Sequence, residues 1–355
     1  MKSEIFSGYF GKLHCQGIAL DLDGGYIYYS FTTCLVKSDL EGNIIGTVEN
    51  ISGHLGCIAL CPRDGRVYAS LEYKPDSIGR GILAALGRAG EEIPCGFYIA
   101  IFDVDRIDRR GMDAESAGVM KTVYLGTVVE DYMGSVTVGG VTRPHIHGCS
   151  GIDGVTVGPE FGSREGEYLY VAYGIYSDLE REDNDHQVIL QYDFADWWEA
   201  EARPHVAAAM HTEGPRAPRN KYFLYTGNTN FGVQNMEYDR YTGDFFLAVY
   251  SGKKPQFPNY PMYVIDGGIP AHREPLRGSP TGEEGQVLTL RATALSRDGI
   301  SGVDFPYGST GFFAVGDGRY YVSEPCRSEA GEQGTYVRLY RLCEEDGYLR
   351  FIREE

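Results

Sequence analysis

Short strand-like segments recur in groups of four along the whole of this 355-residue chain. Each segment is rich in Tyr, Val, Ile and Phe and is ended by Gly, Asp or Asn, which is typical of β-strands. Turns that contain Gly join the first two strands of a group, as in DLDGG, PRDGR, RYTGD and VGDGR. The pattern predicts five copies of one four-stranded unit, at about residues 14–48, 54–128, 150–227, 233–292 and 308–355.

Repeated four-stranded antiparallel units close into a β-propeller, because each sheet then buries both faces against its neighbours. We therefore predict an all-β fold, with residues 1–355 forming a single five-bladed propeller domain. A two-sheet sandwich is the alternative. A sixth blade within 105–145 is disfavoured, because that stretch holds only one good strand pattern. Short helices are predicted only at 78–90 and 194–210.

On these repeats, the chain resembles five-bladed β-propellers across nearly its whole length. Proteins with that architecture include glycoside hydrolases and calcium-dependent apyrases. The sequence matches the catalytic motif of neither family residue by residue, so the resemblance transfers no catalytic role. What it implies is a fold whose loops on one face surround a small-molecule site, with a carbohydrate as one expected substrate class.

The charge balance excludes a nucleic-acid partner. The net charge is −18, and the largest basic groupings are the pairs Arg109-Arg110 and Lys253-Lys254, so the surface repels phosphate. No apolar run reaches the length of about 18 residues that a membrane span needs. The N-terminus lacks the hydrophobic region of a signal peptide. We expect a cytoplasmic protein, or a chain from which a signal was removed, with its eight Cys reduced.

Long loops are expected on one face of the propeller. The loops between the second and third strands of a blade share a face with the loops that lead to the next blade, and here both sets are long. They cover residues 73–96, 175–186, 251–260 and 324–334, and residues 49–56, 129–153, 228–233 and 293–310. Long loops on a rigid scaffold mark a functional face. The acidic run 178–185 is expected to be a solvated loop, with calcium binding as the alternative.

Three histidines lie where loops would converge on the central channel, and they suggest a metal site. His54, His145 and His147 are the candidate ligands of one divalent metal ion, because imidazole suits several transition metals. Further donors are His14, Gln16 and Gln234. The alternative is that these groups cap backbone atoms or hold a water molecule. No phosphate-binding loop motif occurs, so no nucleotide cofactor is expected.

Acid–base chemistry would use carboxylates on the same face. The candidate catalytic residues are His54, His147, Asp153 and Glu237. A pair of carboxylates would suit glycoside hydrolysis, whereas His and Tyr with a metal would suit proton abstraction and elimination. Other carboxylates near this face are Glu72, Asp304 and Glu324.

Amide and tyrosine side chains complete the expected site. The candidate substrate-binding residues are Gln16, Gln234, Asn235, Tyr173, Tyr250 and Tyr307. Tyr offers a flat apolar face and a hydroxyl, which suit a sugar ring, although most of the 27 Tyr are expected to pack between blades. The hypothesis is a hydrolase or lyase acting on a carbohydrate or a similar polyhydroxylated small molecule. The alternative is a non-catalytic propeller that binds a protein or a small ligand. The oligomeric state stays open.

Overall fold

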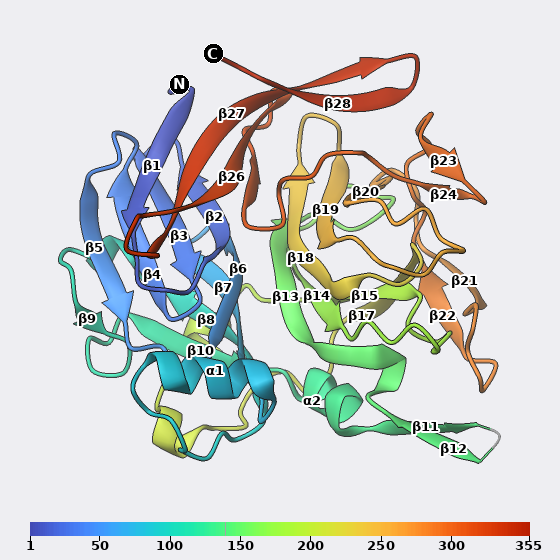
Figure 1. Ribbon diagram of the computed structural model, residues 1–355, viewed down its shortest axis with the longest axis horizontal. Coiled ribbons are helices and arrows are strands. Elements are labelled where there is room, and N and C mark those ends of the chain that lie inside the picture. Colours follow the sequence, from blue (N-terminus) through green and yellow to red (C-terminus); the bar gives the residue numbers. More distant parts are fainter. Residues whose placement is uncertain (139) are drawn as a thin grey trace.

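Five β-sheets surround one axis in the computed structural model, which describes residues 1–138 and 140–355 (Figure 1). The chain is nearly all-β, and the five-bladed propeller predicted from the repeats is confirmed. In Figure 1 the first blade, in blue, lies on the left, and the last blade, in red, crosses the top. Each blade runs outward from the axis in antiparallel order, as the repeat pattern requires.

The first two blades have the strands that their sequences predict. Blade one contains β2 (Cys15–Asp21), β3 (Tyr26–Phe31), β4 (Cys34–Asp39) and β5 (Ile44–Glu49), with β9 (Met112–Asp113) parallel to β5. Blade two contains β6 (His54–Leu60), β7 (Val67–Tyr73), β8 (Gly96–Phe102) and β10 (Met120–Tyr124), with β16 (Arg203–Pro204) at its outer edge.

The third and fourth blades share a segment that was expected to belong to one of them. Blade three contains β13 (Cys149–Gly158), β14 (Tyr168–Ile175), β15 (His186–Tyr192) and β17 (Asn220–Tyr225), extended by β22 (Glu284–Val287) and β21 (His272–Pro275). Blade four contains β18 (Asn230–Asp239), β19 (Asp244–Tyr250) and β20 (Met262–Ile265).

The predicted fourth strand of blade four, 286–292, therefore divides between two sheets. Its beginning lies in β22, which pairs in parallel with β17, whereas Leu290 bridges to Ile265 of β20. Val287 and Leu288 are both buried but belong to different apolar clusters, one on each side of blade three. The segment crosses from one blade to the next because its consecutive apolar side chains are buried on opposite sides.

Both ends of the chain complete blade five. This blade contains β25 (Phe312–Ala314), β26 (Arg319–Arg327), β27 (Gln333–Glu345), β28 (Tyr348–Arg353) and the N-terminal β1 (Glu4–Tyr9). β1 pairs with residues 334–338 of β27, and β28 pairs with residues 340–345. The first and last strands thus join the ring, and both termini lie close together in Figure 1. The sequence pattern predicted β28 but not β1.

One apolar cluster fills each interface between neighbouring blades among the described residues. The interface between blades five and one contains Ile5, Ile18 and Tyr321, all at most 2% exposed. Tyr supplies many of the largest buried side chains, such as Tyr28 and Tyr170. The expectation that most Tyr pack between blades agrees with this burial.

Helices are few and lie in the connections. They are α1 (Ser77–Ala85), α2 (Gly126–Met133) and α3 (Trp197–Ala200), with 3-10 turns at Val104–Arg106, Ile146–Gly148 and Ala207–Ala209. Two hairpins are formed by β11 (Ser135–Val138) with β12 (Val141–Pro144) and by β23 (Ser296–Arg297) with β24 (Ile300–Ser301). α1 overlaps the predicted range 78–90 but begins one residue earlier, α3 falls inside 194–210, and α2 was not predicted. Among the described helices, none has the length and apolarity that crossing a bilayer requires.

Ring closure predicts different roles for the two strands that share the edge of β27. Ile5→Ala on β1 should lower the free energy of unfolding by about 2–5 kcal/mol, because Ile5 is buried between blades. Ile352→Ala on β28 should cost about 0.5 kcal/mol or less, because Ile352 is 53% exposed. Urea unfolding followed by fluorescence measures both variants, and equal losses would contradict closure through β1.

Candidate active site

Asn235 connects several blades near the axis of the ring. On β18, its Nδ2 donates to the Gln16 carbonyl oxygen at 2.8 Å and to the Ser309 carbonyl oxygen at 3.0 Å. The Cys57 thiol donates to Asn235 Oδ1 at 3.3 Å. The Gln16 amide in turn donates to Thr32 Oγ1 at 3.1 Å. Gln16 and Asn235 were predicted to bind substrate, but their amide groups form hydrogen bonds within the protein. These bonds connect segments of blades one, two and four and the segment before blade five.

A histidine lies between two buried carboxyl groups at one mouth of the central channel. His54 begins β6 and is directly opposite Glu72 on β7, while Asp153 lies at an irregularity in β13. His54 Nδ1 is 3.5 Å from Glu72 Oε1 and 3.5 Å from Asp153 Oδ1. Two of the predicted catalytic residues, His54 and Asp153, are thus brought together, with Glu72 beside them.

Lys74 neutralises Glu72. The Lys74 ammonium forms an ion pair with Glu72 Oε1 and donates to the Ser150 carbonyl oxygen at 2.9 Å. Glu72 Oε2 accepts from the Ile152 N–H at 3.1 Å. Because both side chains are at most 5% exposed, the pair is a fixed part of the wall. Sequence reasoning missed Lys74, although its i, i+2 spacing from Glu72 indicates the same face of an extended strand.

Asp153 is in a setting that favours its protonated form. Burial and the nearby charge of Glu72 raise the pKa of Asp153 well above its usual value. Gln234, a predicted substrate-binding residue, instead donates its Nε2 to Asp153 Oδ2 at 3.3 Å. Burial, followed by the charge of Lys74, lowers the pKa of His54 to about 3, so the imidazole is neutral at pH 7.

The facing atoms of His54 and Asp153 are buried, and Glu72 Oε1 lies at the same distance from His54 Nδ1 as Asp153 Oδ1 does. In the described part of the chain, His54 Nδ1 and Asp153 Oδ1 are fully buried and make no standard hydrogen bond. A neutral His54 that carries its proton on Nδ1 can donate it to Asp153 Oδ1 if the 3.5 Å separation shortens, and this tautomer leaves the lone pair on Nε2. The exposed 13% of the His54 side chain does not include this buried nitrogen.

Two glycines give these groups their space. Gly151 has φ +129°, and a Cβ there would lie 1.9 Å from Glu72 Oε2. A Cβ at Gly56 would lie 2.8 Å from Asp153 Oδ1. The glycines near the starts of the inner strands are therefore needed for the carboxyl groups to approach His54.

An open cleft of about 590 Å³ lies against blades four, five and one. Neither His54 nor Asp153 lines it, and His54 lines a separate pocket of about 10 Å³ with Glu72 and Lys74. Asp153 is connected to the cleft through Gln234, which bonds to it, and through the next residue, Asn235, which donates to the carbonyl oxygen of the cleft residue Ser309.

The lining of the cleft includes Tyr250 and Tyr307, as predicted for a substrate site, together with His14. Burial and the charge of Asp153 raise the pKa of Tyr250 to about 12. The charge of His14 adds to the lowering of the His54 pKa. The cleft and the pair are therefore within electrostatic reach of each other.

The three histidines of the predicted metal site have different surroundings. His145 Nδ1 is 2.6 Å from the Tyr132 carbonyl oxygen. His147 Nε2 is 3.7 Å from Glu283 Oε1, whereas His54 faces Asp153. Among residues 1–138 and 140–355, no group of three or more His, Cys, Asp and Glu side chains is arranged to hold a metal ion. The metal ion stays a prediction without a ligand set in this part of the chain.

Two further predicted residues lie apart from the pair. Tyr173 is fully buried, and its hydroxyl donates to Asp131 Oδ2 at 2.6 Å, so it packs in the protein interior. Glu237 lines a cleft of about 710 Å³ at the other mouth of the channel, where its Oε1 accepts from the Ala314 N–H at 2.9 Å. Asn235 precedes it on the same face of β18. Glu237 therefore does not form a catalytic pair with Asp153.

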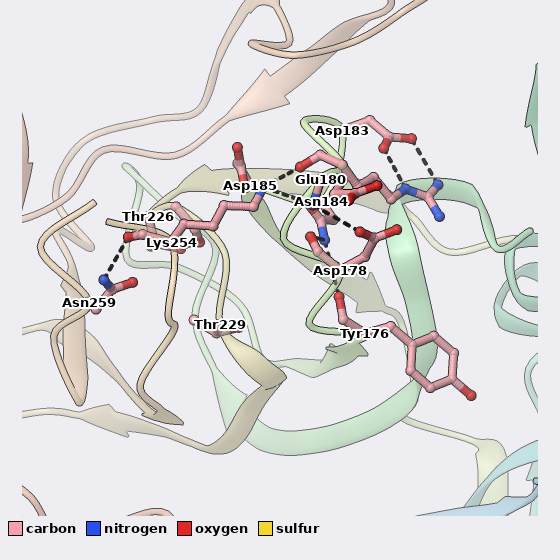
Figure 2. A network of polar contacts seen from close by, with 12 residues as sticks. Tyr176, Asp178, Glu180, Asp183, Asn184, Asp185, Thr226, Thr229, Lys254 and Asn259 are labelled. Carbon is pink, nitrogen blue, oxygen red and sulfur yellow. Dashed lines mark hydrogen bonds and ion pairs between the residues drawn. The ribbon is translucent and has the colours of Figure 1, made fainter. Parts of the chain in front are cut away.

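A buried lysine ties two of the long loops together (Figure 2). The Lys254 side chain is 1% exposed and reaches the loop before β15. Its ammonium donates to Asp185 Oδ1 at 2.6 Å, to Asn184 Oδ1 at 3.0 Å and to the Arg181 carbonyl oxygen. The end of the acidic run 178–185 is therefore buried rather than solvated, and the Lys254 ammonium occupies the place among its oxygens that a cation would take.

No family model matches the chain, and no curated protein matches it. Solved structures to which it is similar include an exo-1,5-α-L-arabinanase from a bovine ruminal metagenomic library, with 11% identity over 98% of this chain and 99% of that chain, at a TM-score of 0.43. A family GH43 β-1,3-galactosidase with galactodeoxynojirimycin has 12% identity over 98% and 97%, at 0.41. The soluble aldose sugar dehydrogenase of Escherichia coli has 10% identity over 93% and 98%, at 0.35.

The Lys254 contacts predict a large loss of stability on truncation. Lys254→Ala should lower the free energy of unfolding by about 3–5 kcal/mol, because it leaves the buried Asp185 without its counter-charge. Lys253→Ala, at the exposed neighbouring position, is the control and should change little. Urea unfolding of the two variants distinguishes them. We call the contacts of Lys254 with Arg181, Asn184 and Asp185 the Lys254 clamp. A Lys254→Ala protein as stable as the control would show that this clamp contributes nothing to the free energy of unfolding.

Glu237 predicts a pH dependence of stability. Burial raises its pKa from 4.5 to about 8, so the native state keeps a proton that the unfolded chain releases. Stability of the wild type should fall between pH 4.5 and 8 by up to about 1.4 kcal/mol per pH unit relative to Glu237→Gln. Urea unfolding at pH 5, 6.5 and 8 measures the difference. The stability of Glu41→Gln, at an exposed site, should depend on pH as that of the wild type does. The same pH dependence in Glu237→Gln would refute the raised pKa of Glu237.

Proposed function

We propose that this protein is a lyase, which uses His54 and Asp153 for acid–base elimination on a polyhydroxylated, carbohydrate-like small molecule. The observation that carries the proposal is the His54 imidazole, which lies 3.5 Å from each of two buried carboxyl groups, on the face of the ring that also carries an open cleft. A neutral imidazole next to a carboxyl group can both accept and donate a proton.

Elimination is favoured over hydrolysis by a pair of carboxylates. In such hydrolysis the scissile bond lies between the two carboxyl groups, but here the His54 ring lies between Glu72 and Asp153. Glu72 is also held in its ion pair with Lys74. Neither feature leaves room for a sugar between two free carboxyl groups, whereas both leave the outer edge of His54 available.

The proposed step needs one proton carrier. His54 Nε2 accepts a proton from a C–H bond of the substrate, and the electron pair of that bond forms the new C=C bond. The C–O bond on the adjacent carbon breaks, and the departing oxygen takes the proton back from His54. Asp153 accepts a hydrogen bond from His54 Nδ1–H, which keeps the lone pair on Nε2 and sets the orientation of the ring, as a carboxyl partner does for other catalytic histidines.

The cleft has the lining that a polyhydroxylated substrate requires. Tyr250 and Tyr307 offer aromatic faces, and Ser309 and Thr310 offer hydrogen-bonding groups near the same opening. Tyr307 is 41% exposed, which leaves its ring available to stack against a sugar. Binding of the substrate and proton transfer are thereby assigned to separate side chains.

The test is turnover of a panel of sugars and sugar acids by purified protein, followed by the absorbance of the conjugated C=C product and by NMR. His54→Asn should lower kcat by about 10²–10⁴-fold, with circular dichroism and thermal stability close to wild type. His272→Asn, at a site 54% exposed, is the control. A His54→Asn protein with wild-type turnover would refute the mechanism, and sugar binding without any product would identify a binding protein instead.

The pH profile gives a second readout for the same pair. Activity should rise along an alkaline limb as the pH passes through the elevated pKa of Asp153, because the ionised carboxylate stabilises the imidazolium that forms when His54 takes the substrate proton. Gln234→Leu removes the hydrogen bond that stabilises the ionised carboxylate. This variant should raise the pKa further and shift the alkaline limb to higher pH, and a limb that does not move would contradict the role given to Asp153.

A further inference from the structure

The open cleft of about 590 Å³ contains an arginine, and none of the described residues that line it is Asp or Glu. The arginine is Arg327, the last residue of β26. Asp and Glu together outnumber Lys and Arg by 50 to 32 in this chain. The cleft thus has a positively charged side chain and no negatively charged one, although the protein as a whole is acidic. Such a local positive charge attracts anions.

Neighbouring side chains orient the Arg327 guanidinium without neutralising it. Arg327 pairs across the blade with Gln333 of β27. With the Gln333 amide turned to satisfy both residues, its oxygen accepts from Arg327 Nε at 2.8 Å and from Nη2 at 3.2 Å. In the described part of the chain no carboxylate lies within ion-pair distance of Arg327. The remaining N–H groups of the fork can therefore bind a ligand.

Arg327 also connects electrostatically to the catalytic pair. Burial, followed by the charge of Arg327, lowers the pKa of His14, and His14 lines the cleft with Arg327. His14 in turn acts on the pKa of His54. The contacts give the same connection, because Ser309 lines the cleft with Arg327 and accepts from Asn235, the neighbour of the Gln234 that bonds to Asp153. A ligand anchored at Arg327 thus lies on the same face of the ring as Asp153.

We propose that the substrate is an acidic sugar, whose carboxylate Arg327 binds with the planar fork that matches carboxylate geometry. This inference rests on the proposed elimination at His54. A carboxylate next to the C–H bond makes the proton easier to remove, because the charge left on carbon spreads onto the carboxylate, where the guanidinium stabilises it. The proton passes to His54, the C=C bond forms, and the C–O bond on the next carbon breaks as its oxygen takes the proton. The products are an unsaturated acid and an alcohol or water.

The experiment compares D-galacturonate with D-galactose, because the two sugars differ by the carboxylate. Calorimetric titration of the wild type should give an affinity for galacturonate at least about tenfold higher than for galactose. Arg327→Gln should abolish that difference and leave galactose binding unchanged. Arg319→Gln removes the same charge at the opposite end of β26, where Arg319 pairs with Asp317, and should keep the preference.

The outcomes separate this inference from the proposed function. Equal affinity for the two sugars, binding of neither, or equal losses in Arg327→Gln and Arg319→Gln would overturn the assignment of an acidic substrate. His54→Asn should bind galacturonate as the wild type does, because His54 acts on protons and not on the carboxylate. If Arg327→Gln loses the preference while His54→Asn keeps full turnover of the substrate identified in the panel, the acidic substrate stands and the elimination mechanism fails.

Discussion

Pairing of both chain ends with one edge of β27 is the constraint on which the rest of this structure depends. A propeller is a ring, so blades five and one are covered on both faces only when the interface between them forms. Here β1 supplies Ile5 to that last interface, while β28 continues the same edge. The mouth of the channel keeps its shape only because the five blades are held at fixed positions around it.

Closure of the ring sets the positions of the side chains at the channel mouth that contains His54. His54, Glu72 and Asp153 come from blades two and three, and the open cleft on the same face is lined by blades four, five and one. Buried charges are costly unless they are paired, and Lys74 supplies the counter-charge of Glu72. Asp153 has no such counter-charge of its own, so its protonation state is the one that depends on pH. The ring therefore buries two carboxyl groups beside His54 at this mouth, and perturbed proton affinities of this kind are common at functional sites.

The repeat pattern was enough to predict the propeller, because strand composition and Gly-containing turns are local properties. It could not predict that β1 joins the last blade, since that pairing links residues more than 300 positions apart and leaves no local signal. Segment 284–291 shows the same limit, because two sheets compete for its hydrogen bonds.

Site residues divide in a similar way. Position before an inner strand located His54, and Asp153 and Tyr250 were located through the loops. The same criterion grouped His145 and His147 with His54, but side-chain direction separates them. Gln16 and Asn235 are polar residues near the axis whose amide groups bond to the ring itself. Lys74 and Arg327 matter through their partners, and partners across a sheet cannot be read from spacing in one chain.

Because of the Lys254 clamp, the order of the two loops does not depend on a dissolved ion. A loop that is organised by a dissolved ion loses its order when the ion is diluted or captured by a chelator, because occupancy follows concentration. The ammonium that fills the oxygens of Asn184 and Asp185 is covalently part of the neighbouring loop, so its local concentration never changes. This rim of the mouth is thereby independent of the supply of metal ions, and two blades share the cation that orders it.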